Sequence, residues 1–221
     1  MNERKDLDGW PSERDQIASV PYIHAFGQVT LSYNMMEIMM GNLFTTCVPM
    51  ELDFAERLFH KLNNRERIDL LSALVRTNEK ESEAREAILH CIRCYDICTD
   101  NRNILMHVTL DDLDATAVLL KKRASQDPTR DIIFHVPLTD LRLVADQIGQ
   151  TFQYTYDLFI WLLRREAHGF HLKGVTTLLG DLATVPPGPL PDRPPKPRKL
   201  TPYQPPEADA GTQSPPQPSE A

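Results

Sequence analysis

A stripe of mainly apolar residues between positions 141 and 162 is the feature that most limits what this chain can fold into. Its members recur every three or four residues: Leu141, Val144, Ala145, Ile148, Phe152, Thr155, Phe159 and Leu162. This spacing places them on one face of a helix, which must be buried against other elements. Because Pro137 ends the preceding segment and Thr139 can cap, we expect a long helix to about His168.

Four earlier segments show the same helical spacing. The first, His24 to Cys47, is apolar on two sides, which is typical of a helix that is central or shared with a second subunit. The second is bracketed by Pro49 and Asn63-Asn64, and a short third carries Ile68, Leu71, Leu74 and Val75. The fourth should cover roughly residues 80–106, with its glutamates early, as the helix dipole favours.

The period changes after His107. Residues 115–120 are compatible with a strand, residues 125–128 have turn chemistry, and residues 132–136 are β-branched or aromatic, which predicts a β-hairpin. The predicted fold class is therefore all-α. We expect a helical bundle of about five helices with a small β-hairpin before the last helix, followed by a disordered Pro-rich C-terminal tail.

Three regions follow from these patterns. Residues 1–22 are polar and read as a loose N-terminal arm from which Trp10 or Tyr22 docks; residues 23–175 form the helical domain, with the hairpin as an insertion at about 115–137. Residues 176–221 form the predicted disordered tail, because 13 of the 36 residues from Pro186 onward are proline and such a composition cannot build a packed core. Within it, residues 191–196 match the spacing read by SH3-type grooves, although the tail can also be a simple spacer.

Composition narrows the setting. No window reaches 18 uncharged apolar residues and the first ten residues lack an export signal, so we expect a cytoplasmic protein with no membrane association. The four cysteines should then stay reduced. The chain has a net charge of −7, and acidic and basic residues are equal in number in the Pro-rich tail, so the folded part carries the excess acid. This argues against a broad basic surface for nucleic acid, and any RNA contact must be local.

Three of those cysteines lie close together. Cys91, Cys94 and Cys98 share one helix face and could hold a metal with a fourth ligand. They also continue the core stripe of the fourth helix, and cysteine packs as a small buried hydrophobe. We expect core packing, and no metal or cofactor.

The candidate site lies where the fourth helical pattern ends, in residues 100–107. Arg102 can clamp a phosphate with its guanidinium, His107 can move a proton near neutral pH, and Asn103 can orient either group. In the alternative, this is a polar helix end, where Arg102 pairs with Asp100 or Asp96 and Asn103 caps the helix. On a continuous helix Arg102 and His107 would diverge by roughly 140°, which predicts that one helix alone cannot close the site.

A helical bundle with an arginine, a polar residue and a histidine a few positions later resembles the HEPN superfamily, whose motif is an arginine, four to six residues and then a histidine. The resemblance rests on Arg102, Asn103 and His107 and loosely covers residues 24–168. It implies a homodimer with the motif at the two-fold interface, and metal-independent endoribonuclease activity of a toxin or defence type, with RNA as substrate and a possible cognate antitoxin. Asn34 and Glu37, polar residues inside the first helix, are further candidates for the site or for an interface hydrogen bond.

A different class of function fits the same chain. The bundle could be a non-enzymatic dimerisation module whose Pro-rich tail recruits a partner protein. A nuclease depends on Arg102, whereas an interaction module depends on the tail.

Overall fold

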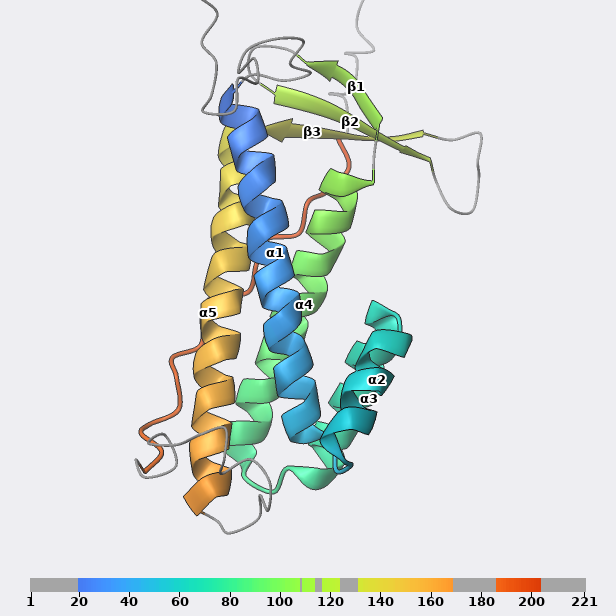
Figure 1. The fold of residues 1–221 in the computed structure, drawn as a ribbon. Helices are drawn as coiled ribbons and strands as arrows, with labels where there is room; N and C mark the ends of the chain where they lie inside the picture. Colours follow the sequence, from blue (N-terminus) through green and yellow to red (C-terminus); the bar gives the residue numbers. More distant parts are fainter. Residues whose placement is uncertain (1–19, 108, 114–116, 124–130, 169–185, 204–221) are drawn as a thin grey trace, which may run out of the picture.

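The computed structural model describes residues 20–107, 109–113, 117–123, 131–168 and 186–203 (Figure 1). The elements in chain order are α1 (Val20–Cys47), α2 (Leu52–Lys61), α3 (Asn64–Asn78), α4 (Ser82–Met106), β1 (Thr109–Leu113), β2 (Ala117–Arg123), β3 (Asp131–Pro137) and α5 (Leu138–His168). The predicted fold class is confirmed: a five-helix bundle has a small antiparallel hairpin before its last helix.

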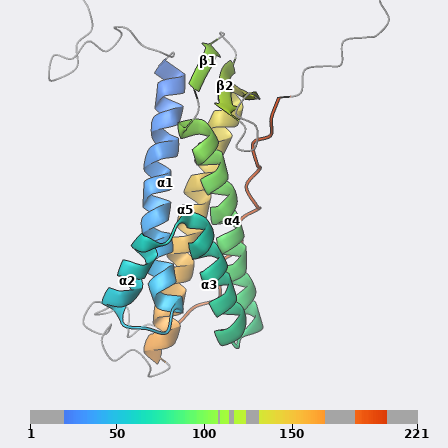
Figure 2. The ribbon, with the colours of Figure 1, turned by 90° about the vertical axis from the view of Figure 1, so that its right-hand side faces the viewer.

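The three long helices form the body of the molecule. Helices α1 and α5 run in the same direction, α4 runs opposite to them, and the short pair α2 and α3 packs beside the half of the bundle that is far from the sheet (Figures 1 and 2). Most of the α5 face predicted to be inward is buried, with Leu141, Ile148 and Thr155 fully shielded from solvent. Three members of the predicted stripe, Ala145, Phe152 and Phe159, are only half-buried. Full burial of a leucine or isoleucine side chain contributes about 1.5–3 kcal/mol.

Several helix starts differ from expectation. Helix α2 begins at Leu52 rather than at Pro49, and α5 begins at Leu138, before the Thr139 that was expected to cap it. Helix α1 begins at Val20 rather than near His24, so Tyr22, expected to dock from a loose arm, is a buried residue of its first turn. Asn63, expected at the end of the second helix, begins the third. Its side chain accepts from the Glu66 backbone N–H at 3.0 Å and its own N–H donates to the Glu66 carboxylate at 2.8 Å, a capping box.

The sheet has one strand more than predicted. Strands β2 and β3 form the expected hairpin, with Leu120 paired to Phe134 and Val118 to Val136. Strand β1, in a segment expected to be irregular, pairs antiparallel with β2 and gives the order β1-β2-β3. Residues 124–130, which contain the predicted turn, lie outside the described residues.

The Pro-rich region corrects a prediction. Residues 186–203, expected to be disordered, lie extended along α4 and α5 and reach β3 (Figures 1 and 2). We call this segment the strap. Leu200 is 7% exposed and belongs to the core cluster, and the Tyr203 N–H donates to the Ile133 carbonyl of β3 at 2.8 Å. The predicted arm up to residue 19, and the tail predictions for 176–185 and 204–221, concern residues outside the description.

Candidate functional site

The candidate site lies at the sheet-proximal end of α4. Met106 is the last helical residue, and His107 is the C-cap with φ −120° and ψ 26°, which departs from helical geometry. The His107 backbone N–H still donates to the Asn103 carbonyl at 3.2 Å. The helix therefore positions Arg102 and Asn103, while His107 turns away from the helical path.

The three residues predicted from sequence come together within one chain. The Nη1 group of Arg102 donates to Nε2 of His107 at 2.9 Å and to Oδ1 of Asn103 at 3.2 Å. The expectation that one helix alone cannot bring Arg102 to His107 was wrong. The wheel angle applies only to helical residues, and His107 is no longer one.

This contact defines the state of the imidazole. A guanidinium has no acceptor atom, so His107 must accept through an unprotonated Nε2 and carry its proton on Nδ1. His107 is exposed, whereas Arg102 and Asn103 are half-buried. The arrangement therefore holds a solvent-accessible imidazole against a permanent positive charge.

Arg102 is also held from the side of α1. Its guanidinium carbon lies 5.2 Å from the centroid of the Tyr33 ring, a cation–π distance. The Nε atom of Arg102 is buried and has no hydrogen-bond partner among the described residues. A buried donor without a partner costs about 1–3 kcal/mol, so the side chain retains unused hydrogen-bonding capacity.

The alternative pairing of Arg102 with an aspartate is not seen among the described residues. Asp100 instead accepts from the Lys199 ammonium of the strap at 2.5 Å. Burial, and then the neighbouring Asp100, raise the pKa of the Asp96 carboxyl. The side chain of Asn103 contacts Arg102 instead of capping α4, so the polar groups at this helix end are organised around the arginine.

A polar pocket of about 540 Å³ adjoins the site between α3, α4 and the strap. Asn103 lines it, but Arg102 and His107 are not among its lining residues; the others are Asn63, Asn64, Arg65, Ile68, Asp96, Thr99, Asp100 and Lys199. The Tyr33 hydroxyl, below Arg102, lies 3.2 Å from the Thr99 hydroxyl and accepts from the Asn64 amide at 3.2 Å. A hydrogen-bond network therefore connects the pocket wall to the ring that supports Arg102.

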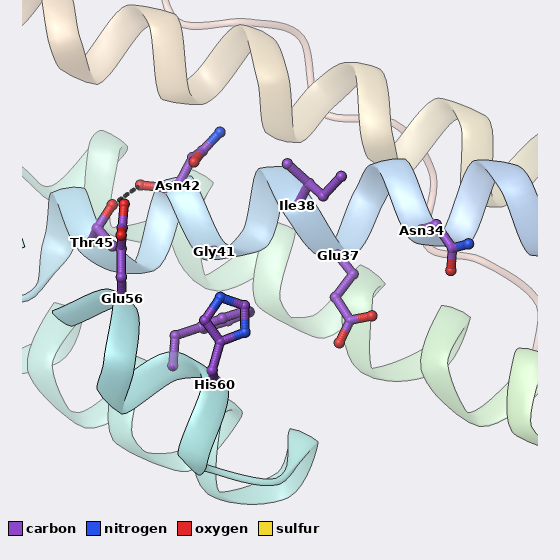
Figure 3. A pocket seen from close by; sticks show the side chains of 9 residues that line it. Asn34, Glu37, Ile38, Gly41, Asn42, Thr45, Glu56 and His60 are labelled. Atoms are coloured by element: carbon purple, nitrogen blue, oxygen red, sulfur yellow. Dashed lines mark hydrogen bonds between the residues drawn. The ribbon is translucent and has the colours of Figure 1, made fainter. Parts of the chain in front are cut away.

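A second pocket, of about 510 Å³, lies between α1 and α2 (Figure 3). It includes both polar residues of the first helix that the sequence singled out, Asn34 and Glu37, and Figure 3 shows Glu37 from α1 and His60 from α2 pointing toward the space between these helices. Glu37 accepts from Arg67 at 2.9 Å. Nη1 of Arg67 also donates to Oδ1 of Asn64 at 3.0 Å, so this ion pair is linked to the Tyr33 network. Among the described hydrogen bonds and ion pairs, neither Asn34 nor Glu37 contacts Arg102, Asn103 or His107.

Gly41 allows α1 and α2 to approach closely at this second pocket. A Cβ atom at Gly41 would lie 3.3 Å from Cε1 of Phe59, tighter than ordinary packing. The guanidinium of Arg67 lies 4.1 Å from the centroid of the same ring. The Phe59 ring, which lines this pocket, therefore packs between Gly41 and the guanidinium of Arg67.

The cysteine cluster is part of the core. Cys91, Cys94 and Cys98 are buried, as predicted, and the Sγ atoms of Cys91 and Cys98 lie 3.1 Å and 3.5 Å from the hydroxyls of Thr155 and Thr151 on α5. Within the part of the chain that the structure describes, no group of three or more His, Cys, Asp or Glu side chains could hold a metal ion.

Sequence reasoning missed the residues that support the trio. Tyr33, whose ring lies against Arg102, had no expected role beyond its place in the first helix. Lys199, which lines the adjoining pocket, lay in the predicted disordered tail. The one available signal was Asn101, a polar residue next to Arg102 on a helix that must be buried, because a buried amide needs partners.

Comparison with known proteins adds no relative: no protein-family model, no curated protein and no solved structure matches this chain. None of the described helices has the length and apolar character needed to cross a membrane.

Proposed function

We propose that this protein acts on RNA in the manner of the HEPN-like proteins it resembles, as a metal-independent endoribonuclease of a toxin or defence type. The observation that carries the proposal is the contact of Arg102 with both His107 and Asn103 at an exposed helix end. A guanidinium beside an imidazole supplies the two functions that phosphodiester cleavage needs, charge stabilisation and proton transfer.

The reaction would be an internal transfer. The 2′-oxygen attacks phosphorus, its proton passes to His107, and the bond to the 5′-oxygen breaks, leaving a 2′,3′-cyclic phosphate and a 5′-hydroxyl that takes up a proton. Arg102 would stabilise the charge on the phosphorane oxygens, and Asn103 would orient the histidine or hold one of these oxygens. Proton balance needs no redox partner and no metal.

The contact between Arg102 and His107 suggests how substrate would start the reaction. Nε2 of His107, the atom that would accept the proton, is occupied by an arginine N–H in this arrangement. A phosphate competes for the same guanidinium, because an anionic acceptor binds arginine more strongly than a neutral ring nitrogen does. Substrate binding would thus move Arg102 onto the phosphate and free His107 to act as the base.

We also propose that the active form is a homodimer built on α1. The exposed side of this helix carries large apolar side chains, with Leu31 63% and Ile38 59% exposed. Glu37 is the only Asp, Glu, Lys or Arg in α1, and it pairs with Arg67. An uncharged, apolar and exposed helix face favours association with another surface of the same kind.

Cleavage of labelled RNA in EDTA tests the catalytic proposal. We expect wild-type protein to produce 2′,3′-cyclic phosphate ends, and His107→Ala and Arg102→Ala to lose at least about 100-fold in rate, in line with the usual contribution of a general base. His60→Ala, which removes an exposed histidine on α2, is the matched control and should cleave like wild type. Equal amounts of intact RNA with wild type and His107→Ala would contradict the proposal.

The non-enzymatic interaction module is the second candidate, and the exposed apolar face of α1 favours it independently of Arg102. For this candidate, Arg102→Ala has no effect on cellular activity. Substitutions on the α1 face or in the strap then abolish it.

A further inference from the structure

We propose that the bundle carries a binding site for extended, proline-rich peptide segments, and that the strap is its detachable occupant rather than part of the folding framework. The site is formed by α4, α5 and the free edge of β3. This inference does not depend on the proposed nuclease activity.

Asn101 is the centre of the site. It lies on α4, is 1% exposed, and uses both ends of its amide on the strap: Nδ2 donates to the Arg198 carbonyl at 2.8 Å, and Oδ1 accepts from the Leu200 N–H at 2.8 Å. From α5, the Gln147 side chain accepts from the Arg198 N–H at 3.0 Å. Two side-chain amides therefore read the backbone of an extended segment, which is how peptide grooves bind main chain.

Further polar contacts follow the strap on both sides of this centre. Nε2 of His90 donates to the Pro194 carbonyl at 2.8 Å, and Nε1 of Trp161 donates to the Gly188 carbonyl at 2.8 Å. The Tyr203 N–H donates to Ile133 on β3. Every one of these donors and acceptors on the strap is a backbone group, so the site selects an extended backbone more than a particular side chain.

The side-chain requirements are few. Leu200 is the apolar anchor and Pro197 is also buried, while Lys199 and Arg198 pair with Asp100 and Asp140 at the rim. The ligand class is thus an extended peptide with proline near its centre, a basic pair and then an aliphatic residue. Proline restricts the free peptide to extended forms, which lowers the entropy lost on binding.

Two features favour a detachable occupant over a framework element. Residues 186–203 contain no helix or strand of their own, so within the described part of the chain it is the bundle surface that holds them. Their ion pairs involve partly exposed side chains, with Arg198 61% and Lys199 59% exposed, and such pairs contribute only about 0–1 kcal/mol each. Of the residues in the buried core cluster, Leu200 is the only one that the described part of the strap supplies.

Occupancy also changes the neighbouring site. Lys199 and Asn103 line the same polar pocket, so an occupied groove adds a positive charge beside the Arg102 trio. Removing the strap would leave Asp96 and Asp100 in that pocket without the positive charge of Lys199.

Exchange of the strap for a peptide in trans tests the inference. In the full chain, Leu200→Asp should release the strap while leaving every residue of the groove in place. We expect a fluorescent peptide of residues 186–203 to bind this variant, measured by anisotropy, and to bind wild type at least about tenfold more weakly because the groove is filled. A peptide carrying Leu200→Asp is the matched control and should not bind, and Asn101→Ala in the strap-released chain should weaken binding at least tenfold.

Hydrogen exchange on unaltered wild type gives a second measurement. We expect the Leu200 and Tyr203 amides to exchange through local opening, faster than amides in the middle of α4. The inference is overturned if these amides exchange only with global unfolding. It is also overturned if the Leu200→Asp chain fails to fold by circular dichroism, or folds but leaves the wild-type peptide unbound.

Discussion

The backbone N–H of Leu200 donates to the side chain of Asn101 at 2.8 Å, across 99 positions of sequence. The same asparagine donates to Arg198, so its amide is fully used although it sits on a buried helix face. A buried amide is tolerated only when it is satisfied. The Pro-rich strap therefore supplies both hydrogen-bond partners of the buried Asn101 amide on α4.

Asn101→Ala should destabilise the fold. It leaves the Leu200 N–H and the Arg198 carbonyl without their partner, and we expect the free energy of unfolding in urea to fall by about 1–3 kcal/mol. Gln150→Ala, at an exposed position of α5, is the control and should stay within about 0.5 kcal/mol of wild type. Equal losses in the two variants would show that the Asn101 contacts carry no net stability.

His90 should make stability depend on pH. Burial lowers the pKa of His90 below its ordinary 6.5, and the hydrogen bond to Pro194 opposes this only in part. Because the unfolded chain takes up this proton first, stability is complete above pH 6.5 and is lost as the pH falls from there toward the lower pKa of the folded state.

His90→Gln keeps an N–H donor for Pro194 but does not titrate in this range. Between about pH 7.5 and 5.5 we expect the urea midpoint of wild type to fall further than that of His90→Gln. Asp96, whose raised pKa acts in the opposite direction, titrates in both proteins and cancels in the comparison. Parallel curves for the two proteins would rule out His90 as the origin.

The four thiols should be unreactive in the folded protein. Burial raises the pKa of Cys94 to about 11 and those of Cys47, Cys91 and Cys98 to about 12. The Sγ atom of Cys91 lies 3.1 Å from the Thr155 hydroxyl and 3.9 Å from Sδ of Met40, inside the core. At about pH 8 the thiolate fraction is then on the order of one in a thousand or less.

We expect iodoacetamide to modify none of the four within minutes in buffer and all of them in urea, counted by mass spectrometry. In the Leu200→Asp chain Cys94 should react first, because its Sγ lies 3.4 Å from Nε2 of His90, which also binds the strap. Rapid labelling of Cys91 in the native protein would contradict the core packing described here.

The α1 face predicts the oligomeric state. Wild type should have twice the chain mass of 25.2 kDa by light scattering, and the double variant Leu31→Glu with Ile38→Glu should be a folded monomer, since buried charges without partners are unfavourable. Phe54→Glu changes a side chain on α2 that is 60% exposed and should leave the dimer intact. A monomeric wild type at micromolar concentration would refute the dimer proposal.

The helices were predictable because their burial patterns are periodic. The stripe from Leu141 to Leu162 predicted α5, which begins at Leu138 rather than after a Thr139 cap, and the β-branched and aromatic residues 132–136 predicted β3. Strand β1, with the sequence Thr-Leu-Asp-Asp-Leu, has no regular alternation and a register shift between Leu110 and Asp112. Strand β1 forms because it pairs with β2, and such a contact between separate segments cannot be predicted from the local sequence of β1 alone.

The site was predictable in its residues but not in its geometry. Arg102, Asn103 and His107 were identified by their chemistry, and they do meet. Their mutual arrangement depends on where α4 ends, and the φ of −120° at His107 breaks the helical wheel on which the expected divergence was calculated. The strap was not predicted. Its proline-rich composition indicates that the segment cannot form a core of its own, but composition does not show whether the segment binds to the surface of other elements.

A protein shortened at the end of α5, before the proline-rich region begins, would keep all five helices. It would lose the strap, which covers one side of α4 and α5. Asn101 and Gln147 would then be exposed to water. The apolar surface that Leu200 covers would be exposed as well, and such exposed apolar surface promotes aggregation. Biochemists who trim this protein for expression should keep the chain at least to Tyr203.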